Sequence, residues 1–252
     1  MKRALTLAFS TCAFVVAANT AHAEWAIGAG FENFRWKETT SPEVKEQGLR
    51  WALDLTWTQT RDPGLSVAYN LKYYVGEVDY TGAFIGSNLP ISTDVHYRGF
   101  ANELQSIWRM PNNALDIVLA AGWDHWDRTF DRAQEETWDV LYARLGANVN
   151  SGTRQGPFAS VGVKYPVYVR ENAHLTRVGF NENPRLRPDG DFSVYGTIGY
   201  RVNASWDVLA YYDSYRFKES NDVVVSNSTS LVRVFQPKSR QDVVGLKVQH
   251  NF

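Results

Sequence analysis

The sequence predicts an all-β chain folded as an antiparallel up-and-down barrel, because two patterns run through nearly its whole length. Apolar and polar residues alternate with a period of two over segments longer than ordinary globular strands. The links between these segments alternate strictly between short and long. An even number of strands joined in this way places both chain ends at the rim with the short turns. We expect ten strands, with eight or twelve left open where weak segments merge or split.

The composition excludes several other classes of protein. Among 252 residues, 26 Lys and Arg face 27 Asp and Glu, whereas a nucleic-acid binder carries a basic excess. Hydrophobic residues at 44% and charged residues at 21% exclude a disordered chain. A mean hydropathy of -0.35 argues against a bundle of transmembrane helices. The aromatic content of 14% is high and fits β structure.

Residues 1–23 have the organisation of a cleaved secretory signal peptide. Two basic residues stand near the start, residues 5–18 are mostly apolar, and Ala21-His22-Ala23 is a small-residue cleavage pattern. Cleavage there would remove Cys12, the single cysteine, and leave 24 basic against 27 acidic residues. We therefore expect residues 24–252 to form one exported domain without a disulfide.

Ten segments carry the alternation. In residues 49–58, for example, Leu49, Trp51 and Leu53 point one way, and Arg50 and Asp54 point the other. The expected strands are Trp25–Phe31, Leu49–Thr58, Leu65–Gly76, Asp94–Met110, Leu115–Asp124, Leu141–Val149, Ala159–Val169, Phe192–Val202, Asp207–Phe217 and Val244–Phe252.

Three places interrupt the pattern. The first segment loses its phase near Asn33. In residues 94–110 neither phase keeps Glu103 on one face with His96, which predicts a bulge in the middle of that strand. Pro166 cannot donate a ladder hydrogen bond and predicts a second bulge.

The connections and the aromatic residues give the barrel two different rims. Short turns fall at residues 61–64, 111–113, 150–156 and 203–205, and long links at 37–47, 79–93, 128–136, 171–190 and 218–239. Aromatic residues fall at strand ends beside the short turns (Trp25, Trp57, Trp108, Tyr200, Trp206, Phe252) and towards the opposite rim (Phe31, Trp51, Tyr73, Trp123, Tyr165). Two aromatic belts are typical of a barrel that crosses a membrane. A soluble lipocalin-like barrel, with its apolar face inside, is the competing fold.

With these features the chain resembles the outer-membrane β-barrel proteins of Gram-negative bacteria over its whole mature length. The last segment, Val243 to Phe252, adds to the resemblance, since the family ends in a strand with a C-terminal aromatic residue that the barrel-assembly machinery reads. Phe252 fills the terminal position and His250 the aromatic position two before it, while Gly245 lies earlier than usual. The resemblance implies export to the outer membrane, with outer-membrane lipid and lipopolysaccharide as partners.

If the apolar faces meet lipid, the other faces line the lumen. These positions carry both signs of charge: Glu32, Arg50, Asp54, Lys72, Asp116, Asp124, Arg144, Lys164, Arg170, Arg201, Asp207, Asp213 and Lys247. A mixed set in a narrow barrel predicts ion pairs that plug the lumen, because open channels use about 16–18 strands. A narrow, porin-like solute channel is the alternative.

A second alternative is a hydrolase at the rim, as in the ten-stranded omptin proteases, which the resemblance brings in. Asp94, His96, Asp124 and Asp127 are the weak candidates, and His125 would point away from Asp124 because strand neighbours face opposite sides. We expect no catalytic site. We also expect no metal or cofactor, because His96, His125, His174 and His250 lack ligand-like spacing and no Gly-rich phosphate loop is present.

The long links are the remaining place for function. Phe84 and Ile85 form an apolar tip, and Arg177, Arg185 and Arg187 form a basic stretch that fits lipopolysaccharide phosphates. The sequence therefore predicts an outer-membrane barrel with a largely plugged lumen. We expect it to act as a surface binding or structural protein through its extracellular loops.

Overall fold

A computed structural model of the chain describes residues 23–62, 64–83, 89–110, 115–131, 134–150 and 155–252. Within these residues ten long strands form one antiparallel barrel: β1 (Ala23–Glu38), β2 (Val44–Asp62), β3 (Leu65–Ala83), β4 (Pro90–Arg109), β5 (Leu115–Phe130), β6 (Glu135–Asn150), β7 (Gly156–Ala173), β10 (Ser193–Arg201), β11 (Trp206–Phe217) and β14 (Ser239–Asn251). No helix among the described residues is long and apolar enough to cross a membrane.

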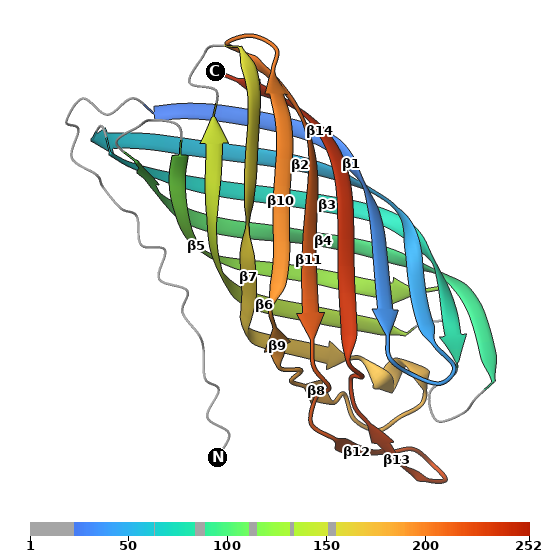
Figure 1. The fold of residues 1–252 in the computed structure, drawn as a ribbon. Coiled ribbons are helices and arrows are strands. Elements are labelled where there is room, and N and C mark those ends of the chain that lie inside the picture. Colours follow the sequence, from blue (N-terminus) through green and yellow to red (C-terminus); the bar gives the residue numbers. More distant parts are fainter. Residues whose placement is uncertain (1–22, 63, 84–88, 111–114, 132–133, 151–154) are drawn as a thin grey trace, which may run out of the picture.

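The barrel closes completely. Each strand from β1 to β7 pairs with the next, β7 pairs with β10, β10 with β11, β11 with β14, and β14 returns to β1. Closure leaves none of these strands as a free edge, so the ladder satisfies the backbone groups without water. The predicted fold class and strand number are confirmed. The C-terminus lies at one rim, called here the termini end, and the long connections lie at the other, called the loop end (Figure 1).

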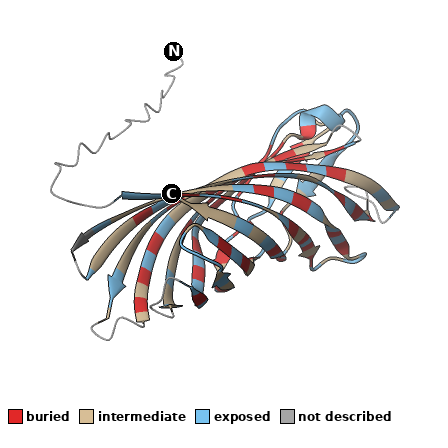
Figure 2. Cartoon of the chain, turned by 90° about the horizontal axis from the view of Figure 1, so that it is seen from above, coloured by how far each residue is buried: buried red, intermediate tan, exposed pale blue. Residues whose placement is uncertain are grey.

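Near the termini end the apolar residues point outwards, and this decides between the two competing barrels. On β2, Leu49 is 61% exposed and Trp51 is 70% exposed. Arg50, which stands between them, and Glu32, opposite it on β1, are buried in the lumen. Buried and exposed residues alternate along the strands in Figure 2. A soluble barrel would have the opposite arrangement, so the soluble alternative is wrong. We call this outward surface the apolar belt.

The predicted aromatic residues border the apolar belt. Trp25 lies opposite Trp57, and Phe31 lies opposite Trp51 on the same two strands, six residues further from the termini end. Large exposed aromatic side chains recur at both levels around the barrel. They are Trp108, Tyr200, Trp206 and Phe252 near the termini end, and Tyr73, Tyr165, Tyr168 and Phe192 nearer the loop end. Two girdles of this kind are the pattern of a barrel that crosses a lipid bilayer.

Beyond the belt the strands continue, and here the sequence prediction was wrong. The links expected at residues 37–47, 79–93 and 128–136 are mostly strand, because β1 runs to Glu38, β3 to Ala83 and β5 to Phe130. On β1 the side chains keep alternating past Asn33, but Phe34 and Trp36 are now the buried ones. We call the barrel wall and connections beyond the belt the extension.

The two predicted bulges have opposite outcomes. Leu141 pairs with Tyr168 and Tyr142 with Pro166, so Val167 is the extra residue of a bulge beside Pro166, as predicted. The bulge predicted in residues 94–110 is wrong, since β4 keeps one register with both neighbours. His96 lies on the outer face of β4 in the extension, where polar side chains meet water, so no change of phase is needed.

The longest connections complete the wall of the extension. Between β7 and β10 lie a short 3-10 helix, η1 (Leu175–Val178), and the two-residue strands β8 (Arg185–Leu186) and β9 (Gly190–Asp191). β8 pairs with β7, and β9 pairs with β11, above the start of the short strand β10. A Cβ at Gly190 would come within 1.9 Å of the carbonyl oxygen of Pro166, so only glycine fits against the bulge.

Candidate functional site

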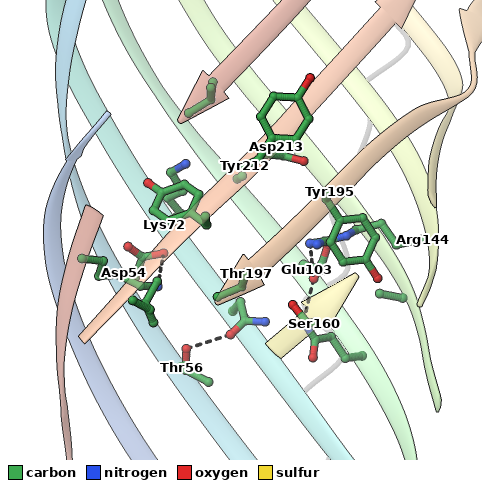
Figure 3. A pocket seen from close by; sticks show the side chains of 18 of the residues that line it. Asp54, Thr56, Lys72, Glu103, Arg144, Ser160, Tyr195, Thr197, Tyr212 and Asp213 are labelled. Atoms are coloured by element: carbon green, nitrogen blue, oxygen red, sulfur yellow. Dashed lines mark hydrogen bonds and ion pairs between the residues drawn. The ribbon is translucent and has the colours of Figure 1, made fainter. Parts of the chain in front are cut away.

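A polar cavity of about 430 Å3 occupies the lumen inside the apolar belt. Its lining reaches from Asn150 and Arg201, at the strand ends of the termini end, up to Tyr74, Tyr142 and Tyr215. Figure 3 shows charged and hydroxyl side chains from several strands around it, including Asp54, Lys72, Glu103 and Arg144. The cavity is therefore lined by polar groups at the termini end and bounded by aromatic rings towards the loop end.

Glu32 is the centre of an ion-pair cluster in the lumen. Its carboxylate is fully buried, and it accepts a hydrogen bond from Arg50 Nη2 at 2.7 Å and from the Tyr211 hydroxyl at 2.7 Å. Lys72 also contacts it. The Arg50 guanidinium lies 4.3 Å from the ring centroid of Phe34 and 4.3 Å from that of Tyr74. Ion pairing and cation–π contacts together compensate the charge of Arg50 in the barrel interior.

The other charges that the alternation assigned to the lumen also have partners there. Lys164 Nζ is 2.7 Å from Asp213, and Lys247 Nζ is 3.3 Å from Asp54. The remaining contacts are Arg144 with Glu103, Arg201 with Asp207, Arg109 with Asp116, and Asp124 with the hydroxyls of Tyr74 and Tyr215. Glu103 was missing from the predicted set because its strand had no clear phase.

The prediction that Arg170 lines the lumen is wrong. It lies on the outer wall, where its Nε donates to Asp139 at 3.1 Å and the side chain is partly exposed. The bulge at Val167 inserts one residue into β7, so the side chains beyond it exchange faces. Glu171 consequently points into the lumen and Arg170 away from it.

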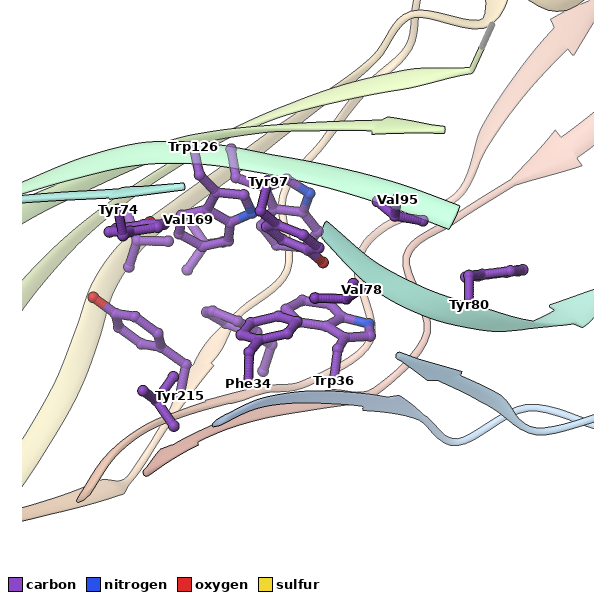
Figure 4. Packing of buried hydrophobic residues seen from close by; sticks show 14 of the residues in the cluster. Phe34, Trp36, Tyr74, Val78, Tyr80, Val95, Tyr97, Trp126, Val169 and Tyr215 are labelled. Carbon is purple, nitrogen blue, oxygen red and sulfur yellow. The ribbon is translucent and has the colours of Figure 1, made fainter. Parts of the chain in front are cut away.

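On the loop-end side of the cavity, aromatic side chains pack inside the barrel. We call Phe34, Trp36, Tyr97, Trp126, Trp138, Tyr215 and Phe217 the aromatic core; each is at most 2% exposed. Trp126 and Trp138 stack with ring centroids 5.4 Å apart, and Trp36 meets Trp138 edge-on at 5.3 Å. Figure 4 shows rings from several strands converging inside the barrel. These packed rings lie between the cavity and the loop end.

Carboxylates gather around Arg128 beside the aromatic core. Arg128 is buried and forms ion pairs with Glu46 and Glu136. Glu38 accepts a hydrogen bond from the Trp36 indole at 2.9 Å, while Oε2 of Glu171 has no hydrogen-bond partner among the described residues. Burial raises the pKa of the Glu38, Glu46 and Glu171 carboxyls. Residues near these positions were predicted to be loops, so sequence reasoning missed the cluster.

The four weak catalytic candidates lie on two sides of the barrel wall. Asp124 is in the lumen, whereas Asp127 and His96 are on the outer wall of the extension. Nε2 of His96 is 3.1 Å from Asp131, and Asp127 pairs with Arg98 at 3.3 Å. Asp94 is two residues before His96 on β4, so it faces outwards as well. Asp124 is therefore on the opposite side of the wall from the other three candidates.

The other histidines have local partners. Nδ1 of His125 is 3.0 Å from Asp139 on the outer wall, and Nε2 of His174 is 3.1 Å from the Thr137 hydroxyl. No group of three His, Cys, Asp or Glu side chains within the described ranges has the geometry to hold a metal ion. His250 lies between Trp206 and Phe252, with both ring centroids at 4.6 Å, so the two residues of the predicted assembly signal pack together.

The two longest connections meet in a small folded unit at the loop end. The hairpin of β12 (Val223–Ser226) and β13 (Leu231–Val234) packs against η1 through a cluster of Ala173, Leu175 and Val225. The Glu182 carboxylate accepts hydrogen bonds from the Ser226 backbone N–H at 2.9 Å and from its hydroxyl. We call residues 174–183 together with 222–234 the loop platform.

The predicted loop contacts have different positions. Arg177 belongs to the loop platform and forms an ion pair with Glu135, and Arg185 and Arg187 are exposed beside β7. Phe84 and Ile85 lie outside the described residues.

Comparison with known proteins identifies the fold. No protein-family model matches the chain, and no curated protein sequence matches it significantly. Among solved structures, the outer membrane protease OmpT from Escherichia coli has a TM-score of 0.51 at 11% identity, covering 92% of this chain and 96% of that one. The chain has the fold of the outer-membrane β-barrel proteins.

Two further solved barrels are less similar. The translocator domain of the autotransporter NalP from Neisseria meningitidis has a TM-score of 0.44 at 11% identity, covering 90% of this chain and 88% of that one. Neisserial surface protein A has a TM-score of 0.42 at 9% identity, covering 92% and 99%. At such identities the likeness concerns the fold alone.

Proposed function

We propose that the chain is a non-conducting outer-membrane protein of a Gram-negative cell, and that its working surface is the extension, turned towards the outside. The observation that carries the proposal is the aromatic core, which fills the bore between the luminal cavity and the loop end. A solute crossing the barrel would have to displace packed rings such as Trp126 and Trp138. The proposal therefore favours a surface role over the narrow channel.

Electrical recording tests the closed bore. Purified protein inserted into a planar bilayer should give no discrete conductance steps. The double variant Trp138→Ala/Tyr215→Ala, which removes two rings from the bore, should introduce steps. The matched control Trp51→Ala/Tyr73→Ala removes the same residue types from the outer face and should stay silent. Regular steps from the unmodified protein would favour the channel and contradict the proposal.

The loop platform is the part of the extension best suited to contact a partner. Its own apolar cluster and the hydrogen bonds to Glu182 hold it in one conformation, which lowers the entropic cost of binding. Val224 and Leu231 point away from that cluster and are 64% and 76% exposed. Exposed apolar side chains on an ordered surface are typical of contact sites.

Photo-crosslinking on intact cells tests the platform. A photoreactive residue in place of Leu231 should give discrete adducts, and the same residue in place of Ser92, on the outer wall of β4, should not. Equal adducts at both positions, or none at either, would contradict a binding role for the platform.

The rim hydrolase is the less favoured candidate because Asp124 lies inside the barrel and the other candidate residues lie on its outer wall. It predicts peptide cleavage that is lost in Asp94→Ala or Asp124→Ala. Cleavage with that dependence would replace the present proposal.

A further inference from the structure

The strand register places four cations side by side on the outer wall of the extension. Lys37 of β1 lies directly opposite Lys45 of β2 on one side and Arg240 of β14 on the other. Arg240 lies opposite Arg216 of β11. We call Lys45, Lys37, Arg240 and Arg216 the cation row. Like charges directly opposite each other destabilise a sheet, so this row costs the folded protein stability unless an anion covers it.

The neighbouring carboxylates compensate the row only in part. Glu43 contacts both Lys37 and Lys45, and Asp242 is 2.7 Å from Arg216 and 3.7 Å from Arg240. Arg35 stands next to the row on β1 and has no ion-pair partner among the described residues. The four cations of the row thus form ion pairs with two carboxylates, and the register places a third, Asp191 of β9, opposite Arg216. With Arg35, five positive charges against three negative ones leave the surface with an excess of positive charge.

These side chains border a hollow that begins at the apolar belt. The hollow has a volume of about 810 Å3, and its lining runs from Asn33 and Val244 to Lys37 and Lys45. Val244 is 56% exposed and lies opposite Asn33, four residues below Arg240 on the same strand. Four residues measure about 13 Å along a strand, or about 10 Å in height at a barrel tilt of 35–45°.

That height is the level of lipid headgroups, because the headgroup region begins where the apolar belt ends. Long Lys and Arg side chains can bend towards the bilayer from slightly above it. The row crosses four strands, a width of about 14 Å at the usual strand spacing, which is wide enough for two phosphate groups on one headgroup. β11, β14, β1 and β2 form one continuous wall in Figure 1.

We propose that the cation row, with Arg35, binds the phosphate groups of a phosphorylated lipid in the outer leaflet of the membrane. The proposal rests on the outer-membrane placement proposed above. It is independent of Arg177, Arg185 and Arg187, which lie elsewhere on the extension. The lipid phosphates neutralise the row, so the bound protein is more stable than the protein in neutral detergent.

The test uses the full chain, folded in zwitterionic detergent and titrated with a diphosphorylated glycolipid. We expect the double variant Lys37→Gln/Arg240→Gln to bind at least about tenfold more weakly than the unmodified protein, since each basic residue contributes to binding an anionic surface. The matched control Arg98→Gln/Arg170→Gln removes two outer-wall arginines that pair with Asp127 and Asp139 on the far side. It should bind within about twofold of the unmodified protein.

Thermal unfolding gives a second readout that a misfolded variant cannot imitate. Without lipid, Lys37→Gln/Arg240→Gln should unfold at a higher temperature than the unmodified protein, because the like-charge contacts are relieved. With glycolipid the order should reverse. Raising the salt concentration should weaken binding to the unmodified protein.

Three outcomes would overturn the proposal: equal glycolipid affinity in both double variants, no affinity in the unmodified protein, or equally tight binding of inorganic pyrophosphate, which would assign the row to a soluble anion. Failure of the protein to insert into bilayers would instead contradict the outer-membrane placement, and a gel-shift assay of folded against boiled protein detects that separately.

Discussion

The two halves of the barrel use the same strands with opposite polarity. In the apolar belt, Ile27 and Phe31 of β1 point outwards and Glu32 is buried inside. A few residues further along the strand, Phe34 and Trp36 are inside and Lys37 is on the outer wall. The backbone alternation does not change, but the less polar surroundings lie outside at one level and inside at the other. The hydrophobic effect therefore places apolar side chains on the outer face of a strand in the belt and on its inner face in the extension.

The largest expected effect comes from breaking the luminal ion pairs of the belt. Glu32→Ala leaves Arg50 and Lys72 without their shared carboxylate, and unpaired buried charges cost about 3–5 kcal/mol. Urea unfolding in detergent, followed by tryptophan fluorescence, should show this loss. The control Glu77→Ala removes an exposed carboxylate from the outer wall of the extension and should change stability by less than about 0.5 kcal/mol. Similar losses in both variants would show that the buried network is not special.

A charge placed on the outer face should separate the two levels of the wall. Leu53→Arg puts a cation into the apolar belt and should cost about 2–4 kcal/mol if the position faces the middle of the bilayer. Ser92→Arg puts the same charge on the outer face of the extension, in water, and should be nearly neutral. Refolding into lipid vesicles, scored by the gel shift of the folded form, measures both. A tolerated Leu53→Arg would move the membrane away from the proposed belt.

The aromatic core should respond to the loss of a single ring system. Trp126→Phe keeps an apolar ring but loses the stacking area against Trp138, and a stacked pair contributes about 0.5–1.5 kcal/mol beyond its buried area. The midpoint of thermal unfolding should fall accordingly. Trp51→Phe, at an exposed position of the belt, serves as the comparison and should lose less. A larger loss at Trp51 would mean that lipid contacts outweigh the core.

The smallest effect is the pH dependence at Glu171. Burial raises the pKa of this carboxyl above 4.5, so its favourable neutral form is present at low pH and is lost as the pH rises through the raised value. Glu171→Gln should therefore match the unmodified protein at about pH 4 and be more stable by about 1 kcal/mol at about pH 8, since Gln stays neutral. Unfolding curves across this range measure the difference.

The control Glu219→Gln, at an exposed carboxylate, should show no such trend. A constant difference between Glu171→Gln and the unmodified protein at every pH would contradict a titrating Glu171.

The sequence predicted the barrel and its strand number, because lipid on one side and polar groups on the other give an unbroken alternation. It failed where that condition ends. Beyond Asn33 the apolar residues of β1 move to the inner face, so the strand looks like a loop to any rule that expects apolar residues to stay outside. The same reason produced the wrong bulge near Glu103 and hid the cluster around Arg128.

Which charges meet in the lumen could not be predicted either. Glu32 contacts Lys72, forty positions away, and Tyr211, from the other end of the chain, and only the closed register brings them together. The single extra residue of the bulge in β7 turns the side chain of Arg170 to the outer face. Pro166 predicted a bulge but not its exact position. The cation row is hidden for the same reason, since its members come from four strands.

The way β8 and β9 complete the wall gives the extension a seam. In the described part of the chain, every other pair of neighbouring barrel strands is joined by at least seven residue pairs. By contrast, β8 pairs with β7, and β9 with β11, through two residue pairs each. Local opening follows the fewest hydrogen bonds, so amide exchange should begin at Leu186 and Gly190 while β2 and β3 stay protected. The wall of the extension thus has one weakly paired segment, and Leu186 in it lies opposite the buried Glu171. A brief opening there would admit water to the core without disturbing the part of the barrel held in lipid.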